Sequence, residues 1–138
     1  MLSYLEACGC LRDEEKAEHA STPTPVYLIS TLSSQQASSL PHEQLHFLYH
    51  IAPSYRSVVQ RHYDSLQAKT QRIIENDLRM RGYAQHVWLD EFQAYVSLDA
   101  GEFGKKAVEE CGPIRLALIQ VQKTLLKEWK DGGHALVE

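Results

Sequence analysis

Apolar residues recur at intervals of three and four along residues 54–81, a stretch without glycine or proline. The positions concerned are Val59, Tyr63, Leu66, Ile73, Ile74 and Leu78, and Thr70 falls on the same face. This spacing places them on one face of an α-helix. Gly82 follows, and Arg79 and Arg81 fall in the last turn, where cations interact favourably with the helix dipole. The pattern predicts one long helix over 54–81 that forms the spine of the fold.

Shorter patterns predict the remaining helices. Pro41 suits the first turn of a helix that runs to Ile51, before Pro53 interrupts it. Residues 88–98 fit a helix better than a pair of strands. Residues 104–111 form a short helix ended by Gly112, and Pro113 opens the last helix. That helix carries a regular apolar stripe of Ile114, Leu118, Val121, Leu125 and Trp129. Residues 26–29 fit either a strand or the start of a helix.

These elements predict an all-α, single-domain bundle of about five helices built on the long central helix. Two prolines within residues 21–25 mark a linker, because proline removes a backbone donor and disfavours helix before it. We therefore expect a mobile N-terminal arm over 1–25 and a helical domain over 26–138. The apolar stripe of the last helix fits either an intramolecular core or a homodimer interface.

The composition is that of an ordinary globular protein. The chain has 138 residues, of which 43% are apolar, and a mean hydropathy of −0.36. No apolar run reaches the roughly 18 residues that a membrane span needs. We expect a cytoplasmic protein whose three cysteines are reduced thiols, since they are few and odd in number. Cys111 has the spacing of a core residue and no obvious histidine to activate it.

Charge alternates along the chain more than its net value of −4 suggests. Basic residues outnumber acidic ones over 54–82, whereas acidic residues dominate 1–20 and 83–112. Such alternation is typical of helices that complement one another or of a surface that meets a partner protein. It is too balanced for general binding of nucleic acid.

The segment His42-Glu43-Gln44-Leu45-His46 has the H-E-x-x-H pattern of zinc peptidases. Two histidines four residues apart on a helix can hold one ion, with Glu43 as general base. However, a helical projection puts the histidines opposite the apolar residues, and Pro41 places His42 in an exposed first turn. The downstream acidic residues Asp64 and Glu75 do not stand in a recognisable sequence pattern for the third zinc ligand. We therefore interpret the motif as a solvated face and expect no cofactor. Metal binding and a zinc-dependent hydrolase stay as alternatives.

No nucleophile elbow, phosphate loop or dinucleotide fingerprint is present. The exposed face of 54–81 instead carries arginine and tyrosine, which are enriched at protein interfaces. The candidate partner-binding residues are Tyr55, Arg56, Arg61, Arg72, Arg79 and Arg81. Our hypothesis is a noncatalytic protein that binds another protein, as an adaptor, regulator or inhibitor does. A helical nucleic-acid-binding regulator is a further alternative, which the acidic stretch 83–112 opposes.

Overall fold

A computed structural model describes residues 27–30 and 33–132 of the chain. These residues form five α-helices and two short 3₁₀ turns, η1 (Ser33–Gln35) and η2 (Gln85–Val87), without a β-strand among them. The helices are α1 (Gln36–Ile51), α2 (Pro53–Asp64), α3 (Ala68–Met80), α4 (Trp88–Leu98) and α5 (Val108–Asp131). The all-α prediction is confirmed, as is the helix over 88–98. The N-terminal arm with Cys8 and Cys10 lies outside the described residues.

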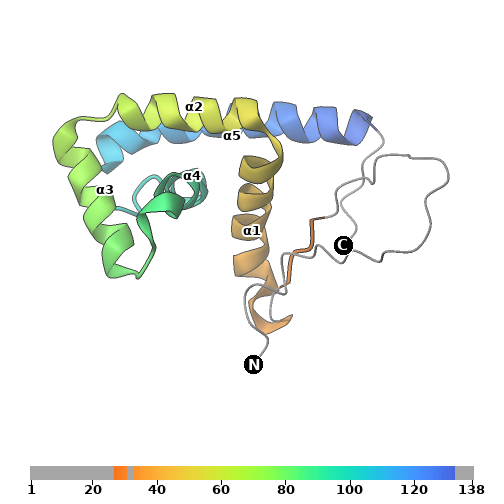
Figure 1. Ribbon diagram of the computed structural model, residues 1–138, viewed down its shortest axis with the longest axis horizontal. Helices are drawn as coiled ribbons and strands as arrows, with labels where there is room; N and C mark the ends of the chain where they lie inside the picture. The colour runs from red at the N-terminus through yellow and green to blue at the C-terminus, as the bar shows by residue number, and fades with distance from the viewer. Residues whose placement is uncertain (1–26, 31–32, 133–138) are drawn as a thin grey trace, which may run out of the picture.

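Helix α4 occupies the centre of the arrangement. In Figure 1, α2 and α5 run side by side across the top, and α3 and α1 descend from them on either side of α4. The short α4 contacts all four other helices. Its buried residues are Phe92, Gln93, Ala94, Val96 and Ser97. Two of these five are polar, which makes hydrogen bonding within the core a requirement of the fold.

The predicted single helix over 54–81 is wrong, because the chain turns at residues 65–67 between α2 and α3. In Figure 1, α2 lies along α5, whereas α3 turns away and descends beside α4. Leu66 within the turn is buried in the core. No glycine or proline marks this break, so its cause lies elsewhere in the fold.

Glu110 of α5 stabilises the break, because it caps the N-terminus of α3. Its carboxylate accepts hydrogen bonds from the Gln67 backbone N–H at 2.8 Å and from the Thr70 hydroxyl at 2.5 Å. These bonds satisfy groups that a new helix start leaves unpaired, and the negative charge favours the positive end of the helix dipole. A contact across about forty positions of the sequence thus compensates for the broken helix.

The two prolines expected to open helices lie inside them instead. Helix α1 begins at Gln36, so Pro41 is internal, and α5 runs through Gly112 and Pro113 without interruption. The separate helix over 104–111 is therefore wrong. Burial explains the continuity of α5, because Ala107, Cys111, Ile114 and Leu118 form one buried stripe across the proline. Tyr27, Leu28 and Ile29 form neither strand nor helix.

Gly82 ends α3 as predicted, and the geometry shows why glycine is required. Its φ is +91°, a value that side chains with a Cβ adopt at a cost. The Tyr83 N–H bonds the Leu78 carbonyl, and the Gly82 N–H bonds the Arg79 carbonyl. This is the Schellman pattern of hydrogen bonds at a helix C-terminus. Among the described helices, none is long and apolar enough to cross a membrane.

Replacing Glu110 with Gln should lower the free energy of unfolding at neutral pH, as measured by urea denaturation. Hydrogen bonds from Thr70 and Gln67 lower the pKa of Glu110. The resulting stabilisation is present above the pKa of the unfolded chain and is lost as pH falls through the lowered folded-state value. The difference between wild type and variant should therefore shrink on acidification. Glu109→Gln is the control, and an equal loss in both variants would exclude the capping role.

Candidate functional site

His42 and His46 of α1 meet Glu91 of α4 in a half-buried cluster. The two histidine Nε2 atoms are 3.0 Å apart. Glu91 Oε2 lies 3.5 Å from His42 Nε2, and Glu91 Oε1 lies 3.7 Å from His46 Nε2. The side chains of His42, His46 and Glu91 are 17%, 13% and 12% exposed. Three potential metal ligands therefore converge on one point.

The interpretation of the histidine face as a solvated strip is wrong, because α4 packs against it. Helix α1 starts one turn and a half before Pro41, so His42 lies within the helix and faces a neighbour rather than solvent. Asp90 and Glu91 belong to the first turn of α4, where acidic residues interact favourably with the helix dipole. The packing of α1 against α4 brings the two histidines of α1 together with the two acidic residues of α4.

Asp90 forms a hydrogen bond with His46, the second histidine of the cluster. Its Oδ1 lies 2.8 Å from His46 Nδ1, on the side of the ring away from His42. Burial alone lowers the pKa of His46. The hydrogen bond to Asp90 and the negative charges of Asp90, Glu91 and Glu43 outweigh burial, so the pKa is raised overall.

Asp90 also connects the cluster to a buried polar network. Gln93 Nε2 donates to Asp90 Oδ1 at 3.1 Å and to the Leu45 carbonyl at 3.2 Å. The Tyr55 hydroxyl donates to Gln93 Oε1 at 2.9 Å and accepts from Gln122 Nε2 at 2.6 Å. Four helices therefore share one chain of hydrogen bonds that ends at His46. A network that satisfies its buried groups fixes the positions of the helices that supply them.

Aromatic side chains cover the outer edge of the cluster. The His42 ring lies 4.7 Å from the Tyr95 ring, measured between centroids. The Tyr83 and Tyr95 hydroxyls are 2.8 Å apart, and the Arg81 guanidinium stands 4.7 Å above the Tyr95 ring. Burial, the Tyr95 hydroxyl and the charge of Glu91 raise the pKa of Tyr83, so its hydroxyl stays neutral. These groups restrict the access of solvent to the histidines.

Two residues near the cluster contribute no ligand to it. His50 is exposed one turn beyond His46, and its ring contacts Tyr27. Cys111 is fully buried in the core, and burial raises the pKa of its thiol to about 11. A thiol in that state is a poor nucleophile at neutral pH. The expectation that Cys111 is a core residue is confirmed.

The six candidate partner-binding residues occupy different environments. Tyr55 is fully buried, so its placement on an exposed face is wrong. Arg56 donates to the Tyr49 and His50 carbonyls at the end of α1. Arg81 pairs with Asp77 and Glu102, and Arg79 donates to Asn76. Arg61 and Arg72 are exposed cations outside the ion pairs and hydrogen bonds of the described residues.

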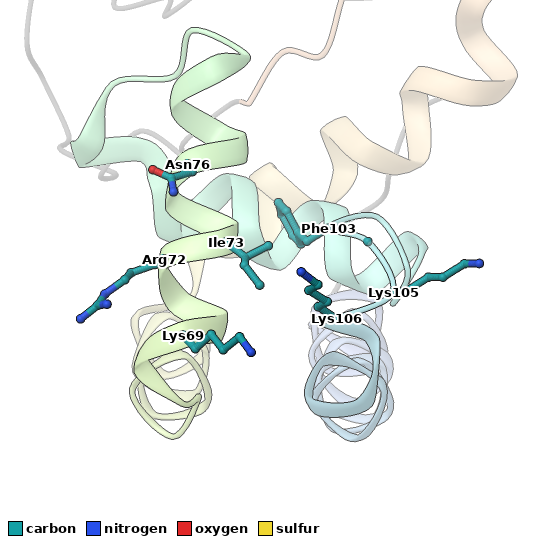
Figure 2. A pocket seen from close by; sticks show the side chains of 8 residues that line it. Lys69, Arg72, Ile73, Asn76, Phe103, Lys105 and Lys106 are labelled. Atoms are coloured by element: carbon teal, nitrogen blue, oxygen red, sulfur yellow. The ribbon is translucent and has the colours of Figure 1, made fainter.

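Arg72 lines a hollow that we call the basic groove. Its volume is about 640 Å³, and its lining residues are Lys69, Arg72, Ile73, Asn76, Phe103, Gly104, Lys105 and Lys106. In Figure 2, Lys69 and Lys106 point into the space between α3 and the segment before α5, while Arg72 and Lys105 point outward. Ile73 extends from α3 towards Phe103 on the opposite side of the groove. The groove thus combines four cations with an apolar floor and has no acidic lining residue.

Comparison with known proteins gives no relative. The sequence matches no protein-family model and no curated protein, and the fold matches no solved structure. The candidate sites therefore rest on their own geometry.

The sequence predicted His42, His46 and Arg72 as candidates but missed Glu91, Asp90 and the lysines of the groove. One signal was available for the acidic pair. Adjacent acidic residues at the start of a helix, combined with an H-E-x-x-H helix elsewhere, are a reason to test that pair as a source of the third ligand. Lys105 and Lys106 carry no comparable signal, because only the folded chain brings them opposite α3.

Removing the Tyr55 hydroxyl with Tyr55→Phe should lower the free energy of unfolding by about 1–3 kcal/mol, the typical cost of leaving buried polar groups unpaired. Both Gln93 and Gln122 lose a partner in this variant. Urea denaturation followed by tryptophan fluorescence measures the loss. Tyr49→Phe is the control, since its hydroxyl is outside the network, and it should change stability by less than about 0.5 kcal/mol. Equal effects of the two substitutions would contradict the role of the network.

Proposed function

We propose that this protein is noncatalytic and acts by binding an acidic segment of another protein in the basic groove. The observation that carries the proposal is a group of four cations without a carboxylate among them. Lys69, Arg72, Lys105 and Lys106 make none of the ion pairs or hydrogen bonds found among the described residues. Like charges repel, so a group of unpaired cations destabilises the isolated chain. An anionic partner that pairs with these cations removes the repulsion, which favours binding.

The four cations of the groove are unpaired among the described residues, although the chain has more acidic than basic residues. The protein carries a net charge of −4, so carboxylates are available to pair with these cations. Other surface cations do pair, as Arg81 does with Asp77 and Glu102. The groove residues instead line a hollow whose size is within the range typical of binding sites, and Lys69 and Lys106 point into it. A surface that attracts acidic groups is the function these features support.

The apolar floor favours a protein segment over nucleic acid. Ile73 of α3 and Phe103 across from it line the groove beside the lysines, and Phe103 is 4% exposed, so it offers no open ring face for stacking a base. An acidic segment with one apolar side chain can contact both the cations and Ile73, which is partly exposed. Four cations contact few phosphates, and affinity for nucleic acid grows with the number of phosphate contacts.

A hydrolase receives less support from the geometry. Two hollows on the described surface lie away from His42 and His46, the basic groove and a smaller one between α2 and α5 that Leu66 and Ile114 line. Aromatic side chains cover the histidine cluster, and a hydrolytic site needs a cleft that admits substrate beside the ion. We therefore assign the interaction role to the groove and treat the histidine cluster separately.

The double substitution Lys69→Glu/Arg72→Glu should abolish partner binding. The tagged wild type and variant are each used to recover partners from lysate, which are quantified by mass spectrometry over a series of salt concentrations. Proteins with acidic segments should be recovered by the wild type, released as salt rises, and absent from the variant. The variant should fold, because both residues are exposed and an acidic residue at position 69 lies in the first turn of α3.

The matched control is Lys123→Glu/Lys130→Glu, which makes the same change of charge at exposed positions of α5. It should recover the same partners as the wild type. Recovery that is unchanged in the groove variant, or lost equally in both, would overturn the assignment of the groove. Recovery that depends on nucleic acid and disappears after nuclease treatment would instead favour the nucleic-acid alternative.

A further inference from the structure

We propose that His42, His46 and Glu91 form a zinc site that joins α1 to α4. This site is independent of the basic groove, and it uses the two histidines of the H-E-x-x-H segment with a ligand that the sequence pattern did not identify. Its ion would bind two imidazoles and one carboxylate, and a fourth position would be open to water. Two histidines and a glutamate are an established ligand set for zinc in proteins.

The distances between the ligand atoms fit a single tetrahedral ion. Ligands at about 2.0–2.1 Å from zinc in a tetrahedron lie about 3.3–3.4 Å from one another. The three contacts among these atoms measure 3.0, 3.5 and 3.7 Å. Each value is close to the tetrahedral spacing, so shifts of a few tenths of an ångström suffice to bind the ion. The backbone of α1 supplies this spacing directly, because residues i and i+4 share one face.

A second observation points to a missing ligand. Glu91 Oε2 is buried and has no hydrogen-bond partner among the described residues. An unpaired carboxylate oxygen in such a place costs free energy that a bound cation removes. The His42 Nε2 atom is 3.5 Å away, within ion-pair distance but longer than an ordinary hydrogen bond. A cluster held only by its own hydrogen bonds does not explain this oxygen, whereas a cation bound beside it does.

Asp90 acts as a positioning residue for His46. When His46 Nδ1–H donates to Asp90 Oδ1, His46 Nε2 carries a lone pair. This Nε2 atom lies 3.0 Å from His42 Nε2 and can bind an ion in place of that contact. Metal-binding histidines in proteins usually have such a carboxylate or carbonyl partner, which fixes the ring and makes the ligand more basic. Gln93 in turn donates to Asp90 Oδ1, so the buried network orients the carboxylate.

The donor atoms favour zinc over calcium or magnesium. Imidazole nitrogens suit zinc and neighbouring transition metals, whereas calcium and magnesium prefer sites built from oxygen. The low exposure of the three side chains also favours a stably held ion, because their packing keeps the ligands in place. We infer that zinc strengthens the contact between α1 and α4, which is the contact that buries the cluster.

The test is calorimetric titration of Zn²⁺ into the full, metal-free chain. The wild type should bind one ion per chain, and Glu91→Gln should weaken binding at least about tenfold. Glu91→Gln keeps the size of the side chain, so circular dichroism should confirm that the fold is intact. Zn²⁺ should also raise the melting temperature of the wild type, because an ion that binds only the folded chain stabilises it. Mg²⁺ at the same concentration should not.

The matched control is His50→Ala, which removes an exposed histidine of the same helix and should leave zinc affinity unchanged. Asp90→Asn tests positioning and should weaken binding about 10–100-fold while the stoichiometry stays at one. Absence of one-to-one binding in the wild type would overturn the site. So would equal affinities of wild type and Glu91→Gln, or a loss of binding on His50→Ala. Loss on Cys8→Ser/Cys10→Ser with no loss on Glu91→Gln would place the ion on the cysteines instead.

Discussion

The fold depends on the hydrogen bonds that the buried polar face of α4 makes with its neighbours. Gln93 lies at the centre of the bundle with no exposure, and an unpaired amide there would cost about 1–3 kcal/mol for each unsatisfied group. Its carbonyl and amide groups bond Tyr55, the Leu45 carbonyl and Asp90. These partners come from three different helices, so one side chain restricts the positions of α1, α2 and α4 together. Apolar packing alone tolerates sliding of helices, whereas these directed bonds do not.

The histidine cluster follows from the same constraint. Because Gln93 fixes Asp90, and Asp90 holds His46, the cluster is oriented from the core outward. Its ligands stand on two helices, and a metal ion would add a link where the packing already brings α1 and α4 together. The basic groove lies at a different part of the molecule, between α3 and residues 103–106. It exists only because α3 turns away from α2, and Glu110 stabilises that turn. Both candidate sites thus depend on polar contacts between distant parts of the sequence.

This dependence explains what the sequence could and could not predict. The apolar periodicity identified the helical class, α4, and the end of α3 at Gly82, since these are decided by local patterns. The break at 65–67 could not be predicted, because its compensating cap comes from Glu110. The sequence favours helix starts at Pro41 and Pro113, because proline inside a helix removes a backbone hydrogen bond. In α5, burial of a continuous apolar stripe outweighs that cost. The histidine face was interpreted as solvated because a helical projection contains no information on which neighbour covers a polar strip.

In our proposal, the contact between α1 and α4 is organised around a point that binds a metal ion. X-ray absorption at the zinc edge of the zinc-loaded chain tests it most directly, because it reports the atoms bonded to the ion. We expect nitrogen and oxygen neighbours at about 2.0–2.1 Å, with the multiple-scattering signature of two imidazoles and no sulfur. A sulfur neighbour at about 2.3 Å, or a shell of oxygen without imidazole, would contradict it.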